Sequence, residues 1–341
     1  MLTHRHFWRA RRWASSALLC GALVACCGPL ALSLPASAAA LPAHQTLQPL
    51  QPLQQRATPG WETLAWGDDA YGQATLPDDA KQDVSAVSAG DFHSLALKDG
   101  GVIAWGSDLY HQTDVPASLS SGVTAVSAGY LHSLAVKDGA VVAWGSNRMG
   151  STDVPADAKS GVSAVAAGQF FSLALKNGAV VAWGDNRYEQ TSVPEEARTD
   201  VKAIAAGQYH ALALTDAGKV IAWGDNRSKQ TDIPAVVKNG VATAIAAGKD
   251  FSVAVVNGRV YAWGSKLANQ NVPALAQSKV TAVAAGYDHI VALLDGGRAI
   301  DWKVNTTGVT AVPALAGTKV QAVSAGAYHA LALRGDPPPT Q

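Results

Sequence analysis

Residues 122–155 read GVTAVSAGYLHSLAVKDGAVVAWGSNRMGSTDVP, a pattern that recurs along the chain. The stretch contains four short segments, GVTAVSA, HSLAV, AVVAWG and TDVP, which are rich in β-branched and small apolar residues. Asp138-Gly139 separates the second segment from the third, and such a pair is typical of a tight hairpin because both positions tolerate positive φ. The stretch therefore predicts a unit of four short antiparallel strands.

The unit repeats at a nearly constant period. Tryptophans of an Ala-Trp-Gly motif lie at positions 66, 105, 144, 183, 223 and 263, followed by Trp302, so the spacing is 39 or 40 residues. A second motif, Ala-Gly, marks the same seven units at Gly90, Gly129, Gly168, Gly207, Gly248, Gly286 and Gly326. No window carries a sustained apolar period of 3.6 residues, which argues against repeats that contain packed helices. Four-stranded units at this period predict an all-β, seven-bladed β-propeller with four strands per blade.

The two ends of the repeat region each hold part of a unit. Six units are complete, whereas residues 61–80 carry only the last two strands and residues 320–333 only the first two. We expect these two pieces to form the last blade together. Such a blade closes the ring and removes the exposed strand edges that promote aggregation.

The first forty residues have the layout of an export signal. Four arginines precede an apolar run from Trp13 to about Leu34, and the small residues 36–38 follow. We expect a signal peptide over residues 1–38, a flexible tether over 39–60, the propeller over 61–334 and a disordered tail over 335–341. The segment LVAC at 23–26 leaves open a lipoprotein signal that ends before Cys26, with a lipid anchor in the cell envelope. The expected location is secreted or periplasmic, with no transmembrane anchor in the mature form.

Charge and cysteine content narrow the partner classes. All three cysteines lie in the leader, so a chain cut after Ala38 has none. Loss of residues 1–40 removes four of the 26 basic residues and none of the 26 acidic ones, leaving 22 against 26 and a formal charge of −4. This mildly acidic charge balance argues against a nucleic-acid partner. We also expect the protein to be a monomer.

Differences between the units concentrate in loops that leave one end of the propeller. In an up-and-down blade, the connections between strands 1 and 2 and between strands 3 and 4 share one end, and these loops are rich in Tyr, Phe and Arg. Such residues dominate interface hot spots, so we predict a partner-binding face, the alternative being amphipathic cover over the blade ends. The predicted partner-binding residues are Asp69, Tyr71, Asp91, Phe92, Tyr110, Tyr130, Arg148, Phe170, Arg187, Tyr188, Tyr209, Arg227, Asp250, Tyr287, Asp288 and Tyr328.

The recurring patterns AGxxHSLAL, DGxVxAWG and NRxxQTxVP resemble the regulator of chromosome condensation repeat family over residues 61–334. The leader and the connecting segments are most similar to its secreted bacterial propellers that inhibit class A β-lactamases. This resemblance implies an inhibitor that binds a folded enzyme through aromatic and acidic loop residues and has no chemistry of its own. Arg148, Arg187 and Arg227 share one offset in three successive units and predict a basic arc, a departure from the acidic and glycine-rich loops that the resemblance implies. A general cell-surface recognition module for proteins or glycans is the alternative.

The other recurring residues are expected to be structural. The tryptophans should pack between adjacent sheets. Histidines recur at positions 93, 132, 210, 289 and 329, and Phe171 and Phe251 occupy the remaining positions, which favours packing over a metal site spread around a ring. No metal, cofactor or catalytic residue is predicted, and the chain is not expected to be an enzyme. Asp91, Asp250 and Asp288 could line a funnel, which leaves open a propeller hydrolase or lyase as the minority alternative.

Overall fold

The computed structural model describes residues 60–265, 271–304 and 310–335. All described residues lie within one compact unit of the chain. The expected signal peptide, the lipoprotein cysteine, the tether up to residue 59 and the tail from residue 336 lie outside the described residues. Among the residues that are described, no helix is both long and apolar enough to cross a bilayer.

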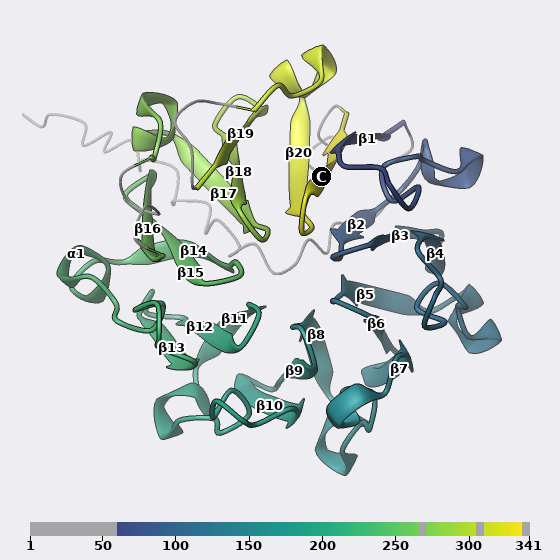
Figure 1. The fold of residues 1–341 in the computed structure, drawn as a ribbon, viewed down its shortest axis with the longest axis horizontal. Helices are drawn as coiled ribbons and strands as arrows, with labels where there is room; N and C mark the ends of the chain where they lie inside the picture. The colour runs from purple at the N-terminus through teal and green to yellow at the C-terminus, as the bar shows by residue number, and fades with distance from the viewer. Residues whose placement is uncertain (1–59, 266–270, 305–309, 336–341) are drawn as a thin grey trace, which may run out of the picture. The chain divides into compact units, whose positions relative to one another are not determined.

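Seven three-stranded antiparallel sheets stand around a common centre, so the predicted seven-bladed propeller is confirmed (Figure 1). Each blade has an inner, a middle and an outer strand. In that order, the strands are β2 (Ala86–Ala89), β3 (His93–Lys98) and β4 (Gly101–Gly106) in blade 1; β5 (Val123–Ala128), β6 (His132–Lys137) and β7 (Ala140–Gly145) in blade 2; β8 (Val162–Ala167), β9 (Phe171–Lys176) and β10 (Ala179–Gly184) in blade 3; β11 (Val201–Ala206), β12 (His210–Thr215) and β13 (Val220–Gly224) in blade 4; β14 (Ala242–Ala247), β15 (Phe251–Val256) and β16 (Arg259–Gly264) in blade 5; β17 (Val280–Ala285), β18 (His289–Leu294) and β19 (Arg298–Lys303) in blade 6; and β20 (Val320–Ala325), β21 (His329–Arg334) and β1 (Glu62–Gly67) in blade 7.

Helical structure in the described residues is limited to single turns. The Val-Pro or equivalent pair that ends each unit fixes the proline at an extended ψ, and a short helical turn begins at the next residue. These turns are the 3₁₀ helices Asp78–Ala80, Ala117–Ser120, Ala156–Ala158, Glu195–Ala197, Ala274–Gln277 and Ala314–Gly317 and the α-helical turn α1 (Ala235–Lys238), while a further 3₁₀ turn, Arg148–Gly150, lies within a loop.

The prediction of a fourth strand in each blade is wrong. In the segment 107–115, the Tyr110 N–H donates to Gln112 Oε1 at 2.8 Å and the Thr113 N–H donates to Asp108 Oδ1 at 3.0 Å. His111 adopts a left-handed conformation with φ of 61°, which turns the chain away from an extended path. Side chains of the loop itself therefore take the backbone donors that a ladder would need, and turn chemistry outweighs the local β propensity.

The two ends of the propeller domain meet in blade 7, as predicted, although the N-terminal piece supplies one strand instead of two. β1 pairs antiparallel with β21 in the register Trp66 to Ala330, and β20 completes the sheet. Figure 1 shows the purple β1 beside the yellow C-terminal strands. The Ala327 N–H donates to the Gly90 carbonyl at 3.3 Å, which ties blade 7 to blade 1 and closes the ring.

The tryptophans of the Ala-Trp-Gly motif are core residues, which confirms their predicted packing. Trp105 and Trp144 are 8% and 7% exposed, and each indole also donates its Nε1–H to a backbone carbonyl in the loop before its own blade. Trp105 donates to the Gln73 carbonyl and Trp144 to the Gln112 carbonyl, both at 2.9 Å. The following Gly106 has φ of 102°, and a Cβ there would lie 2.7 Å from the Phe92 carbonyl oxygen, so only glycine fits.

Candidate binding face

Two sets of loops meet at one end of the propeller, as the sequence predicted. The inner loops join the inner and middle strands, and the outer loops follow the outer strands. The Ser107 N–H, which begins an outer loop, donates to the carbonyl of Phe92 in the inner loop at 2.8 Å. The same bond joins Asp185 to Phe170 at 2.9 Å in blade 3. We call this end the loop face.

Four predicted binding residues form a row of aromatic rings across neighbouring blades. Tyr71 contacts Phe92 edge-on with ring centroids 5.2 Å apart, Phe92 lies 5.6 Å from Tyr130, and Tyr130 meets Phe170 edge-on at 5.4 Å. These distances and tilts are those of favourable aromatic pairs. Tyr71 is 49% exposed, Phe92 and Tyr130 are half-buried, and Phe170 is only 7% exposed. Phe170 therefore supports this aromatic row from below, and Tyr71 presents the most surface.

The other predicted aromatic residues form separate groups. Tyr188 and Tyr209 lie 5.1 Å apart, and Tyr287 and Tyr328 lie 5.8 Å apart. Tyr110 is exposed in the outer loop of blade 1. The loop face thus carries one aromatic row and two separate aromatic pairs.

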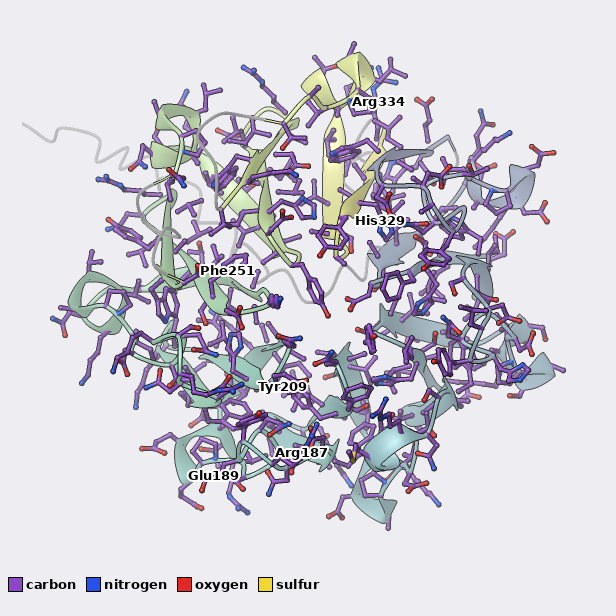
Figure 2. The ribbon with its side chains drawn as sticks, viewed as in Figure 1. Arg187, Glu189, Tyr209, Phe251, His329 and Arg334 are labelled. Carbon is purple, nitrogen blue, oxygen red and sulfur yellow. The ribbon has the colours of Figure 1, made fainter. Side chains whose placement is uncertain are left out.

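Two of the three arginines predicted to form a basic arc are held by buried carboxylates. Arg187 donates two hydrogen bonds to Asp185, from Nε at 3.0 Å and from Nη2 at 3.0 Å, and Arg227 holds Asp225 in the same way. Burial alone would raise the pKa of Asp185, but the hydrogen bonds and charge of Arg187 outweigh it and keep that pKa below its usual value. Most of the expected basic arc is therefore neutralised locally, and Arg148 alone of the three lacks such an aspartate. Figure 2 labels Arg187 near Tyr209, on the same part of the ring.

The predicted acidic residues differ in what they contact. Asp69 accepts bonds from the Ala74 and Thr75 N–H groups at 2.8 and 3.0 Å and from Thr75 Oγ1 at 2.6 Å, so it holds its own loop together. Asp288 lies 3.7 Å from the Lys303 ammonium. Asp250 is half-buried in the inner loop of blade 5. Asp69 is thus committed to loop structure.

The recurring histidines form hydrogen-bonded links between blades, a role that the packing prediction missed. His132 Nε2 lies 3.0 Å from Ser172 Oγ of the next blade, and that hydroxyl donates to the Ser151 carbonyl at 2.9 Å. Because the hydroxyl hydrogen is already used, Ser172 must accept from His132, which places the histidine proton on Nε2. Equivalent bonds join His93 to Ser133, His210 to Ser252 and His329 to Ser94. Burial lowers the pKa of His93 to about 3 and those of His132, His210 and His329 to about 4.

The sequence held a signal for these links in the pairing of residues one blade apart. Where the histidine position holds Phe171, the next blade has Ala211 instead of serine, and Phe251 faces Ile290 in the same way. The blade after His289 has Ala330 at the serine position, and His289 Nδ1 instead lies 3.0 Å from Asp301 Oδ1 of its own blade. Figure 2 labels His329 and Phe251, which occupy this position in blades 7 and 5.

The sequence of the repeat matches a known family profile. The sequence profile described as the regulator of chromosome condensation (RCC1) repeat matches residues 84–112, 123–151, 162–190 and 201–230. The chain carries RCC1 repeats. Each match runs from the inner strand of one blade to the glutamine or serine whose carbonyl receives the next tryptophan, so the repeat and the blade coincide. No curated protein sequence matches the chain significantly.

Solved structures share the fold. The structure of Prp20p from Saccharomyces cerevisiae is 20% identical, covers 84% of this chain and 94% of its own, and has a TM-score of 0.66. Human WBSCR16 is 17% identical, with 81% and 99% coverage and a TM-score of 0.64. The ectodomain of the receptor kinase CR4 from Physcomitrella patens is 23% identical, with 71% and 68% coverage and a TM-score of 0.58.

The centre of the RCC1 propeller is a cavity of about 200 Å³, lined mainly by Ala, Ser and Gly of the inner strands. Charged and polar residues of the inner loops line its wall at the loop face, namely Asp91, Gln169, Gln208, Lys249 and Tyr287. The Lys249 ammonium lies 5.3 Å from the centre of the Tyr287 ring, and both residues favour the ionised form of the Asp91 carboxyl. Asp91 keeps some exposed surface, but its Oδ2 is buried, and burial raises its pKa to about 7 against the opposing effects of Tyr287 and Lys249. These contacts join residues of blades 1, 5 and 6 across this part of the cavity.

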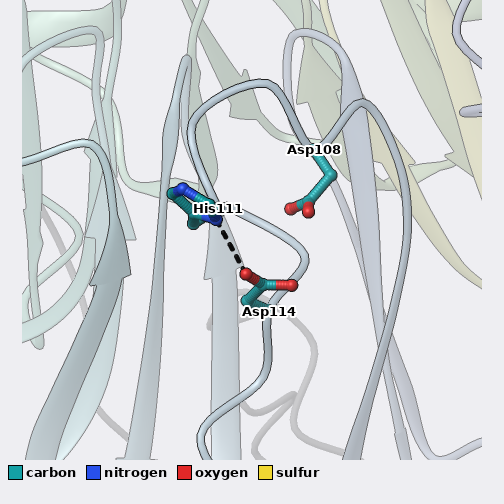
Figure 3. Close-up of side chains that lie close together, drawn as sticks. All are labelled: Asp108, His111 and Asp114. Atoms are coloured by element: carbon teal, nitrogen blue, oxygen red, sulfur yellow. Dashed lines mark hydrogen bonds and ion pairs between the residues drawn. The ribbon is translucent and has the colours of Figure 1, made fainter.

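One group of three possible metal ligands lies in the outer loop of blade 1 of the RCC1 propeller. Figure 3 shows Asp108, His111 and Asp114, whose ligand atoms all lie within 4.8 Å of one another. All three side chains are exposed, and the His111 Nδ1 already pairs with Asp114 at 2.8 Å. Asp108 accepts from the Thr113 N–H, as the corresponding residue does in other outer loops. The group has the contacts of an ordinary outer loop.

Proposed function

We propose that this RCC1 propeller is an exported protein-binding module whose loop face engages a folded partner, without chemistry of its own. The observation that carries the proposal is the row of aromatic rings from Tyr71 to Phe170 on loops that hydrogen bonds hold in place. Aromatic and arginine side chains supply most of the energy at protein interfaces. Because the loops are already ordered, little conformational entropy is lost on binding.

The comparisons support a protein partner in general terms. Prp20p of Saccharomyces cerevisiae is described by its binding to Gsp1p and histones, and a second structure has Kap60 bound to it. In this chain the Arg-rich, apolar leader favours export, so its partner should be an extracellular or periplasmic protein. The resemblance of the repeats and leader to secreted inhibitors points to a class A β-lactamase or a similar extracellular enzyme as the target.

The experiment is a titration of the mature domain against a class A β-lactamase, by calorimetry and by hydrolysis of a chromogenic β-lactam. Tyr130→Ala and Tyr188→Ala should each weaken binding by about 2 kcal/mol, which is roughly 30-fold. Asp138→Ala and Asn177→Ala, in the turns at the opposite end, are the matched controls and should bind as the unaltered domain does. Equal losses at both ends would exclude the loop face.

The same titration separates the inhibitor from the more general function. If no β-lactamase binds at micromolar concentration, inhibition of this enzyme class is excluded. The mature domain would then be tested against envelope proteins and cell-surface glycans, the alternative that the sequence left open. Binding of a glycan with no measurable protein partner would contradict the proposed function itself.

A further inference from the structure

One arginine of the loop face differs from its two counterparts in the charge beside it. Arg148, Arg187 and Arg227 occupy the same position in three successive outer loops. The latter two follow a buried aspartate by two residues and bind it at 3.0 and 2.9 Å. At the corresponding position Arg148 has Ser146. Among the residues that the structure describes, no carboxylate lies within ion-pair distance of the Arg148 guanidinium.

The serine preserves one backbone hydrogen bond of the loop but not the charge. The Arg148 N–H donates to Ser146 Oγ at 3.3 Å, which matches the bond from the Arg187 N–H to Asp185 Oδ1 at 3.1 Å. The N–H of both arginines is therefore held in the same way, although Met149, which follows Arg148, has φ of 61° and Tyr188, which follows Arg187, does not have a positive φ. Only the guanidinium loses its acceptor, because a hydroxyl cannot take the two parallel bonds that a carboxylate takes.

The free guanidinium lies at the end of the aromatic row. Its Cζ is 5.1 Å from the centre of the Phe170 ring, and Phe170 contacts Tyr130, the next member of the row. Arginine stacked on a ring keeps its N–H edge available for hydrogen bonds in the plane of the guanidinium. The stacking also restricts the side chain before any ligand arrives, so less entropy is lost on binding.

We propose that Arg148 binds a carboxylate of the partner protein, an aspartate or glutamate that lies next to an apolar side chain packed on the aromatic row. The proposal rests on the proposed function, since it takes the loop face as the binding surface. It names the chemistry that the partner must present: one acidic group placed beside an apolar contact. Arg187 and Arg227 cannot serve in the same way while their own aspartates occupy them.

The first test needs no knowledge of the partner. The dipeptide N-acetyl-leucyl-glutamate amide is titrated into the mature domain while the arginine Nε–Hε signals are followed by NMR, with N-acetyl-leucyl-glutamine amide as the uncharged control. The Arg148 signal should shift saturably with the acidic peptide only, and the signals of Arg187 and Arg227 should stay in place. Ser146→Asp installs the missing carboxylate and should weaken the response about fivefold, whereas Asp185→Ser should make Arg187 responsive.

Three results of this titration would overturn the proposal. The Arg148 signal could stay still, it could respond equally to both peptides, or the other two arginines could respond as strongly. Glucuronate that shifts the signal as much as the acidic dipeptide would also overturn it, because the site would then suit an anionic glycan as well as a protein.

A second titration, against a class A β-lactamase, separates this proposal from the proposed function. If the β-lactamase binds the unaltered domain and Ser146→Asp equally well, the inhibitor function stands and the role of Arg148 is overturned. If no β-lactamase binds but the acidic dipeptide shifts the Arg148 signal selectively, the carboxylate site stands and the inhibitor function fails.

Discussion

Exchange of one inter-blade histidine link for the apolar pair found at the neighbouring interface should leave stability nearly unchanged at alkaline pH. His132 bonds Ser172 at 3.0 Å between blades 2 and 3, and at the next interface Phe171 and Ala211 occupy the same two positions. The variant His132→Phe with Ser172→Ala therefore places a pair that the fold already contains into an equivalent setting. All four positions are buried.

The single and double variants should differ in a defined way. Ser172→Ala alone leaves the His132 Nε2–H buried without an acceptor, which should cost about 2 kcal/mol of unfolding free energy. When both partners are replaced by apolar groups of fitting shape, the loss should fall below about 1 kcal/mol, because no polar group is left unsatisfied.

Lower pH should reverse the order of stability. Burial lowers the pKa of His132 to about 4, so the unfolded chain binds this proton below about pH 6.5 while the folded chain does not. The unaltered protein therefore loses stability at this site as the pH falls from about 6.5 to 4. At pH 5 the loss is about 2 kcal/mol, and the double variant, which lacks the histidine, does not incur it.

Urea unfolding followed by tryptophan fluorescence at pH 8 and pH 5 measures these differences. Relative to the unaltered protein, the double variant should gain about 2 kcal/mol between the two pH values. A difference between the two proteins that is the same at pH 8 and pH 5 would show that His132 does not titrate as its burial requires. A single Ser172→Ala variant as stable as the double variant would refute the assigned hydrogen bond.

Three further predictions concern ring closure and chemistry. Deletion of β1 (Glu62–Gly67) should abolish cooperative thermal unfolding because β21 loses one of its two partner strands in the closing blade, and a sharp, unshifted transition would exclude the closure. Asp301→Ala removes the acceptor of the Trp66 Nε1–H at 2.8 Å and the partner of His289, and urea unfolding should show a loss of about 3 kcal/mol. Burial alone would lower the pKa of His289, but the hydrogen bond and charge of Asp301 outweigh it and raise that pKa. The pair therefore stabilises the fold fully below about pH 6.5, and the loss of stability caused by Asp301→Ala should become smaller as the pH rises to 9. The propeller domain should hydrolyse no glycoside, ester or peptide in broad screens, and EDTA should not change its unfolding temperature, whereas turnover that one carboxylate substitution abolishes would contradict this.

The sequence predicted the blades better than the loops. The period of the Trp and Gly motifs and the partial units at both ends predict seven blades and the split blade 7, because these features repeat. The fourth strand could not be excluded from TDVP alone, since the deciding contacts run from Asp108 and Gln112 to the backbone of their own loop. The shared offset of the three arginines likewise suggested a basic arc, although the aspartates that bind two of them lie only two residues earlier in the sequence.

The sequence pattern could not predict the distances between the aromatic rings of the loop face or how deeply each ring is buried. Phe170 and Tyr130 occupy adjacent positions of their respective inner loops, which gives one a buried side chain and leaves the other half-exposed. The pairing of histidine with serine and of phenylalanine with alanine could be predicted from the sequence, because the two partners lie about one repeat period apart. The histidine positions alone do not reveal it, because the partner of each histidine lies in the next unit.

In the inner loops, the residues that form the surface of the propeller differ from those that hold neighbouring blades together. The Gly90 N–H donates to the His93 carbonyl at 2.8 Å and the Asp91 N–H to the Gly129 carbonyl at 3.1 Å, so backbone bonds hold this loop at both ends. A Cβ on Gly90 would lie 2.6 Å from the Gly129 carbonyl oxygen, which keeps the loop pressed against the next blade. Phe92 takes part in neither bond through its side chain, and His93 behind it carries the link to Ser133. Substitutions at the ring positions of the loop face can therefore change what the surface binds while the links between blades stay intact.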